Sequence, residues 1–74
     1  MNKYKNLSKK SSVDSYIYTN SDITVKFTDG KSYLYSILKN TPEEIKRMRK
    51  FADLGYGLGA MLATKPYHIH DSKW

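Results

Sequence analysis

Hydrophobic and polar residues alternate along the first half of the chain, as they do in β-strands that bury one face. The alternation begins at residues 13–19, where Val13 and Ile17 share one face and Tyr16 and Tyr18 share the other. A polar Asn-Ser-Asp sequence then interrupts the pattern, which is typical of a turn. The pattern therefore predicts a first strand that is followed directly by an antiparallel neighbour.

Two further strands and a tight turn come next. Residues 23–28 have a strict period of two, with hydrophobic residues on one side and threonine or lysine on the other. Asp29-Gly30 is a strong hairpin signal, and residues 31–37 supply the third strand. The first half of the chain is thus predicted to form a three-stranded antiparallel meander.

The length of the hairpin loop decides which face of the sheet the tyrosines occupy. A two-residue loop pairs Val25 with Leu34 and places Tyr33 and Tyr35 on the polar face. A three-residue loop, with Gly30 in the left-handed conformation, pairs Val25 with Tyr33 instead. Because a shift of one residue turns every side chain to the other face, the hydrophobic pattern favours the three-residue loop. The hydrophobic face would then consist of Ile23, Val25, Phe27, Tyr33, Tyr35 and Ile37.

A helix is predicted to follow the sheet. Thr41 is a good N-cap, Pro42 suits the first helical position, and Glu44 completes a capping box. The helix should end near Leu54, with Gly55 as the residue that terminates it. At 100° per residue, the side that packs on the sheet carries Ile45, Met48, Phe51 and Ala52.

The rest of the chain completes an α+β fold. Closely spaced glycines and then Ala-Met-Leu-Ala predict a tight turn into a short second helix, which Pro66 ends. We expect residues 1–12 to be a flexible basic arm, residues 13–67 to form the domain, and residues 68–74 to be a tail or short strand. The predicted architecture is a three-stranded antiparallel meander covered by an amphipathic helix, with a short second helix.

Composition narrows the class of protein. A chain of 74 residues forms one domain at most, and without cysteine its core must be built from hydrophobic side chains alone. The basic N-terminus lacks the apolar segment of an export signal, and no run of residues is long and apolar enough to span a membrane. We therefore expect a cytoplasmic protein with no membrane partner.

Serine, tyrosine, hydrophobic and glycine residues follow a distinctive order between positions 11 and 67. The residues concerned are Ser11, Ser12, Tyr16, Ile17, Tyr18, Ile23, Val25, Phe27, Gly30, Tyr33, Leu34, Tyr35, Ala52, Gly55, Lys65 and Tyr67. This order resembles the KTSC domain, a family named for the C-terminal extension of some lysyl-tRNA synthetases and also found as stand-alone proteins of about this length. The resemblance supports the predicted fold and implies binding of nucleic acid, RNA in particular.

The chain departs from that family in two places. The connection over residues 36–41 is longer than the short Val-Pro step of the family. The aromatic-Asn-x-x-Ile-Arg segment of the family is replaced here by Leu-Gly-Ala-Met-Leu at residues 58–62. Contacts made through that asparagine and arginine are therefore not transferred to this chain.

Neither catalysis nor a cofactor is expected. The glycines of residues 55–59 lack the spacing and the preceding strand of a dinucleotide-binding loop. His68, His70 and Asp71 offer too few ligands for a structural zinc site, so we expect no metal. A nucleophile, a base and an orienting group do not occur together in the sequence. We therefore predict that the protein is not an enzyme.

Positive charge is the main functional feature. The net charge of +6 favours polyanionic partners, and much of the charge gathers on the predicted helix side opposite its hydrophobic stripe. The candidate binding residues are Lys46, Arg47, Arg49, Lys50, Lys26 and Lys31, with Tyr16, Tyr18 and Tyr56 as exposed rings on which bases could stack. The sequence thus predicts a small non-enzymatic nucleic-acid-binding module, preferring RNA or single strands.

Other interpretations stay open at this stage. Glu43 could pair with Lys46 or Arg47, so that the basic side only keeps the helix soluble. A second function fits the sequence equally well, namely a small adaptor or inhibitor, of phage or host origin, that binds an acidic surface of a larger protein. Ile17 and Leu34 would lie on an uncovered sheet face, which leaves room for a homodimer.

Overall fold

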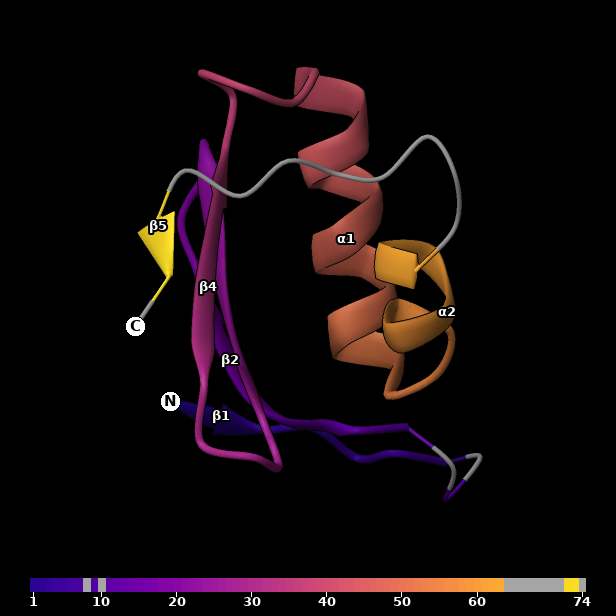
Figure 1. Ribbon diagram of the computed structural model, residues 1–74. Coiled ribbons are helices and arrows are strands. Elements are labelled where there is room, and N and C mark those ends of the chain that lie inside the picture. The colour runs from indigo at the N-terminus through magenta and orange to yellow at the C-terminus, as the bar shows by residue number, and fades with distance from the viewer. Residues whose placement is uncertain (8, 10, 64–71, 74) are drawn as a thin grey trace.

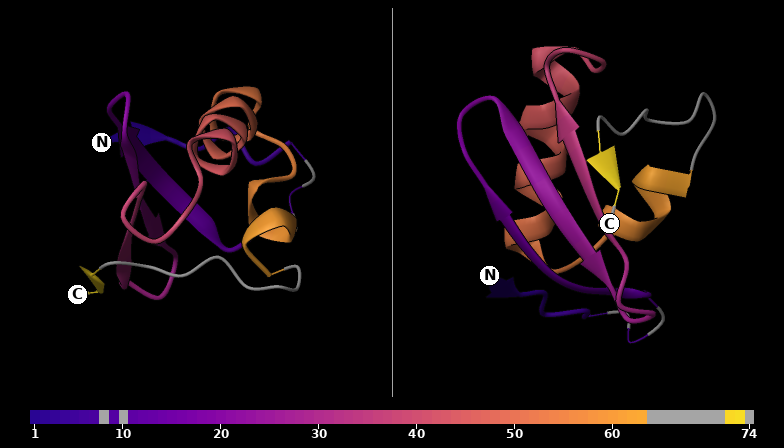
Figure 2. Two further views of the ribbon diagram at one scale, coloured as in Figure 1. Left: turned by 90° about the horizontal axis from the view of Figure 1, so that it is seen from above. Right: turned by 60° about the vertical axis from the view of Figure 1, so that its left-hand side comes forward.

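The computed structural model describes residues 1–7, 9, 11–63 and 72–73, which form an antiparallel sheet and two helices (Figure 1). The sheet has five strands in the order β1-β2-β3-β4-β5. Both helices lie on the same face of the sheet, as the view from above also shows (Figure 2). The elements are β1 (Asn2–Lys3), β2 (Val13–Tyr18), β3 (Asp22–Phe27), β4 (Ser32–Ser36), α1 (Pro42–Leu54), α2 (Leu58–Ala63) and β5 (Ser72–Lys73).

The α+β class, the antiparallel sheet and the two helices agree with the prediction, but the number of strands does not. The three predicted strands are β2, β3 and β4, and the structure adds β1 beside β2 and β5 beside β4. Each added strand is two residues long. A strand this short carries no period-two pattern, so β1 was not predicted. β5 lies within residues 68–74, for which a short strand was one of the two alternatives.

The β3–β4 hairpin has the predicted three-residue loop. Val25 lies opposite Tyr33, and Gly30 has a positive φ of 89°, which glycine adopts without steric cost. The Gly30 N–H donates to the carbonyl of Phe27 at 2.9 Å, as in a type I turn followed by a bulge. Ile37 was predicted at the end of the hydrophobic face, but it lies beyond β4 and is 47% exposed.

A bulge corrects the predicted faces of β2. The pairing with β3 shifts between Val13 and Ser15, and a bulge adds one residue to the bulged strand. As a result Val13 and Tyr16 both lie in the core, although uninterrupted alternation predicts them on opposite faces. Ile17 remains on the other face and is 50% exposed. The prediction for Val13 was wrong because it assumed a regular strand.

Helix α1 begins and ends as the sequence predicts. The Thr41 hydroxyl accepts a hydrogen bond from the N–H of Glu44 at 3.2 Å, and Pro42 is the first helical residue. At the other end Gly55 adopts the left-handed conformation, with φ of 73°, and its N–H donates to the carbonyl of Phe51 at 3.0 Å. Both ends of the helix are therefore fixed by local hydrogen bonds.

The core fills the space between the sheet and the helices. Its members are Tyr4, Val13, Tyr16, Ile23, Val25, Tyr35, Ile45, Met48, Ala52 and Leu58. Within the described ranges, neither helix is long and apolar enough to cross a membrane.

Tyr4 is the unexpected member of this core, because it belongs to the predicted flexible arm. Its side chain is 4% exposed, and its hydroxyl oxygen accepts a hydrogen bond from the N–H of Leu58 at 3.3 Å. The N–H of Leu7 donates to the carbonyl of Gly55 at 2.7 Å. The beginning of the arm is thus part of the fold, and an isolated tyrosine among polar residues gives no periodic signal of burial.

Candidate nucleic-acid interface

The exposed side of α1 carries three basic residues. Ile45 and Met48 point into the core, with 1% and 0% of their surfaces exposed. Because successive residues are 100° apart, Lys46, Arg47 and Lys50 emerge on the other side, and all three are exposed. We call these three residues the basic face of α1. Its position is rigid because the opposite side of the helix is buried against the sheet.

Arg49 does not belong to this exposed set, although the sequence placed it there. It is half-buried, and its guanidinium carbon lies 5.6 Å from the ring centroid of Tyr18 in β2, a favourable cation–π arrangement. Its Nη1 is 3.5 Å from the carbonyl oxygen of Thr19, and its buried Nε has no hydrogen-bond partner among the described residues. Arg49 therefore joins α1 to the sheet.

Asp53 receives hydrogen bonds from two of the three tyrosines predicted to stack on bases. The hydroxyl of Tyr16 donates to Oδ1 at 2.9 Å, and that of Tyr18 donates to Oδ2 at 2.7 Å. The two rings are nearly parallel, with an interplanar angle of 9°. Burial, and then the hydrogen bond to Asp53, raise the pKa of Tyr16 to about 12. The pKa of Tyr18 is also raised, chiefly by its hydrogen bond to the same carboxylate. This tyrosine–aspartate cluster ties the last turn of α1 to β2.

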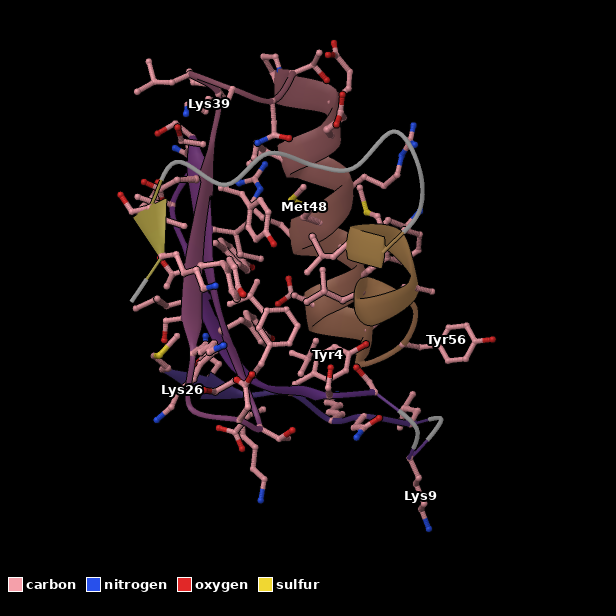
Figure 3. The ribbon with its side chains drawn as sticks, in the orientation of Figure 1. Tyr4, Lys9, Lys26, Lys39, Met48 and Tyr56 are labelled. Carbon is pink, nitrogen blue, oxygen red and sulfur yellow. The ribbon has the colours of Figure 1, made fainter. Side chains whose placement is uncertain are left out.

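The three tyrosines predicted to stack on bases differ in the exposed fraction of their side chains. Tyr16 is only 7% exposed, so the prediction that it offers a free ring was wrong. Tyr18 is half-buried beneath Arg49. Tyr56 is 61% exposed, and its ring points away from the molecule just beyond the C-terminal end of α1 (Figure 3). Tyr56 is therefore the one member of the predicted stacking set with an open ring.

The structure separates the remaining candidates from the basic face. Lys26 follows the buried Val25 in β3 and points to the sheet face opposite the helices, where Figure 3 shows it far from α1. Lys31 is exposed next to the turn of the β3–β4 hairpin. Strand alternation alone places Lys26 away from a helix that covers the hydrophobic face. The six basic residues predicted to bind thus lie on several surfaces of the protein. Only Lys46, Arg47 and Lys50 share a surface.

Asp53 and Lys5 lie at the C-terminal end of α1, and neither was predicted from the sequence to take part in this region. Asp53 stands in the last helical turn, where a carboxylate is unfavourable to the helix dipole, and this position was a signal that it has a specific partner. Lys5, in the predicted arm, packs so closely against Gly55 that a Cβ at position 55 would collide with its side chain. The arm thus brings an exposed lysine to the C-terminal end of α1, where positive charge is favourable.

Comparisons with protein families, with curated proteins and with solved structures find no match for this chain. Among the residues that the structure describes, no three His, Cys, Asp or Glu side chains gather in a way that could hold a metal ion. The sequence candidates His68, His70 and Asp71 lie outside the described residues.

Proposed function

We propose that this protein is a small non-enzymatic module that binds RNA or single-stranded nucleic acid through the basic face of α1. The observation that carries the proposal is the shared exposure of Lys46, Arg47 and Lys50 on a helix whose other side is locked into the core. Lys46 and Lys50 are one turn apart, a rise of about 6 Å. Fixed cations at this spacing can contact neighbouring phosphates of one strand, and such contacts supply most of the affinity of non-specific binding.

Tyr56 supports a preference for unpaired bases. Its open ring lies just past the end of the helix that carries the basic face. Stacking of a base on an aromatic side chain contributes roughly 1–3 kcal/mol and does not depend strongly on sequence. A base can stack in this way only where it is not already stacked within a duplex. The resemblance to the KTSC domain, which stays a proposal, points to the same class of ligand.

A titration of fluorescent single-stranded RNA, followed by anisotropy at low salt, tests the proposal. The decisive variant is Arg47→Glu combined with Lys50→Glu, and the matched control is Lys26→Glu combined with Lys31→Glu. Both double variants remove two positive charges and add two negative ones, starting from a net charge of +6. They differ only in the surface that is changed.

We expect the α1 variant to lose most of its affinity and the control to lose much less. For three phosphate contacts by the native protein, the slope of log K against log salt should be about −2 for a single strand. Duplex DNA of the same length should bind more weakly, since Tyr56 finds no unpaired base. Absence of binding at low salt, or equal losses in the two double variants, would refute the proposal.

A second function is favoured by one specific observation. The loop between β4 and α1 presents Ile37, 47% exposed, and Leu38, 86% exposed, next to the exposed Lys39. Hydrophobic side chains beside a cation suit a protein partner with an acidic surface, so the alternative proposal is a small adaptor or inhibitor, of phage or host origin. A pull-down with and without nuclease separates the two functions, because a protein partner retained after nuclease treatment supports the adaptor. In both cases we propose a cytoplasmic location.

Self-association is a related proposal. Ile17 is 50% exposed and Leu34 is half-buried on the sheet face that neither helix covers. A homodimer could bury this face. Sedimentation equilibrium gives the answer directly, and a monomer at high concentration would exclude the dimer.

A further inference from the structure

A cleft of about 340 Å³ opens between the β3–β4 hairpin and α2. Its volume is near the lower end of the range of roughly 300–1,000 Å³ that is common for small-molecule sites. Its lining contains no residue of the basic face of α1 and neither Tyr56 nor Arg49. A ligand of this cleft therefore uses contacts other than those proposed above for binding nucleic acid.

One wall of the cleft is aromatic. The rings of Phe27 and Tyr33 meet edge to face, with centroids 5.3 Å apart and an interplanar angle of 88°. Tyr35 continues this wall, with its ring centroid 6.5 Å from that of Tyr33. Tyr35 is buried, Phe27 and Tyr33 are half-buried, and all three belong to the lining of the cleft. The three-residue hairpin loop places all three rings on this face.

The opposite wall belongs to α2 and is narrow and apolar. It is formed by Leu62 and Gly59. A Cβ on Gly59 would lie 2.8 Å from the Oγ of Ser11, so the glycine allows the chain before β2 to approach α2 closely. A planar ring suits the aromatic side of this cleft, because aromatic rings contact one another by offset stacking or edge to face, and Leu62 offers an apolar contact on the other side.

Polar groups at the cleft limit the choice of ligand. Ser12, Thr28 and Asp29 belong to its lining, and hydroxyl and carboxylate groups are able to hydrogen-bond to the edge of a base. The Oδ1 of Asp29 already accepts a hydrogen bond from the N–H of Lys31 at 2.9 Å. Asp29 also disfavours a bare anion inside the cleft. From β5, the Nζ of Lys73 lies 5.3 Å from the ring centroid of Tyr33 and places a cation beside the aromatic wall. A planar heteroaromatic ring that carries a phosphate outside the cleft satisfies all of these groups.

We propose that this cleft binds a single nucleobase, with Phe27 and Tyr33 contacting its ring and Lys73 contacting the attached phosphate. The base can be that of a free mononucleotide or an unpaired base of a strand, because both present the same ring and phosphate. The cleft of about 340 Å³ is near the lower end of the range for small-molecule sites, which suits a single base.

Chemical-shift mapping of the backbone amides tests this proposal, with adenosine monophosphate, adenosine, ribose 5-phosphate and a single-stranded RNA oligonucleotide as separate probes. We expect adenosine and adenosine monophosphate to shift the amides of Thr28, Asp29, Gly59 and Leu62, and ribose 5-phosphate to leave them unchanged. If the oligonucleotide alone shifts them, the base comes from a strand. If none of the probes shifts them, or ribose 5-phosphate does so as strongly as the nucleotide, the proposal is overturned.

Two variants separate the contacts. Leu62→Trp fills the cleft from the α2 side and should weaken binding of adenosine by roughly tenfold, the scale of one lost stacking contact. Lys73→Glu changes an exposed residue, so it leaves the core intact; it should weaken binding of adenosine monophosphate and leave adenosine unaffected. Equal effects of Lys73→Glu on both probes, or full binding by a folded Leu62→Trp protein, would contradict the assignment. Neither variant changes a residue of the basic face of α1, so loss of RNA binding by Arg47→Glu with Lys50→Glu and loss of adenosine binding by Leu62→Trp are separate results.

Discussion

Replacement of Tyr4 by alanine tests whether the N-terminal segment is an arm or part of the core. The side chain is 4% exposed and is packed in the same cluster as the sheet and helix residues. Truncation of a large buried aromatic side chain costs about 3–5 kcal/mol. At about 0.05–0.15 kcal/mol per residue, a chain of 74 residues has a free energy of unfolding of roughly 4–11 kcal/mol. Tyr4→Ala should therefore remove a large part of the stability.

Tyr4→Phe separates the hydrogen bond from the packing. The ring stays, but the N–H of Leu58 loses the hydroxyl oxygen that accepts its hydrogen bond at 3.3 Å. A buried donor left unpaired costs about 1–3 kcal/mol, so this variant should lie between the native protein and Tyr4→Ala. Leu7→Ala is the matched control from the same segment, because Leu7 is 63% exposed and such surface changes stay within about 0.5 kcal/mol.

Urea unfolding followed by circular dichroism measures all three variants under the same conditions. We expect Tyr4→Ala to lose the most stability and Tyr4→Phe to lose less. Leu7→Ala should lose almost no stability. If the N-terminal segment were a mobile arm, all three variants would have the same free energy of unfolding as the native protein. If Tyr4→Ala costs no more than Leu7→Ala, the burial of Tyr4 does not contribute to the fold in solution, and this reasoning is refuted.

The remaining predictions concern local features of the fold. Gly55→Ala should destabilise the protein by more than Gly30→Ala. Both variants place alanine at positive φ, at a cost of about 1–2 kcal/mol, but only a side chain at position 55 also collides with Lys5 of the N-terminal segment. Equal losses of stability in urea unfolding would contradict this. Thr41→Ala should cost about 1 kcal/mol through loss of the N-cap, and Thr41→Ser should restore most of it in the same assay. The pKa values of Tyr16 and Tyr35 are raised from 10.0 to about 12, so between these pH values the unfolded chain releases protons that the folded protein retains. The contribution of these two phenols to the free energy of unfolding should therefore be constant below pH 10 and fall as the pH rises toward 12. Tyr16→Phe should make this fall shallower, and a profile that stays flat between pH 10 and 12 would show that burial does not perturb these phenols.

The β3–β4 hairpin and α1 could be predicted because several local signals agree there. In the hairpin the hydrophobic pattern and Gly30 select the same register, and Val25 opposite Tyr33 confirms it. In α1 the caps at Thr41 and Gly55 enclose a regular hydrophobic stripe. Where pattern, turn and cap residues all favour one structure, a single sequence is enough to place an element.

The features that escaped prediction depend on contacts distant in the sequence. Tyr4 packs in the core cluster, and its hydroxyl accepts a hydrogen bond from Leu58 of α2, more than fifty residues later. The bulge after Val13 turns Tyr16 into the core, and no local signal marks it. Arg49 is next to the exposed Lys50 in the sequence, yet it lies over a ring of β2. In each case the partner across the fold determines the position of the side chain.

The flank of α1 connects the stability of the fold to the proposed function. Asp53 accepts hydrogen bonds from both Tyr16 and Tyr18, and Arg49 lies over the ring of Tyr18. These two helical residues lie between the buried and the exposed sides, so their contacts with β2 fix the rotation of the helix about its axis. That rotation determines where Lys46, Arg47 and Lys50 point, since a turned helix would carry its cations toward the sheet. Arg49 and Asp53 are therefore positioning residues for the basic face, and a contribution of Arg49 to nucleic-acid binding would act through the direction of its neighbours.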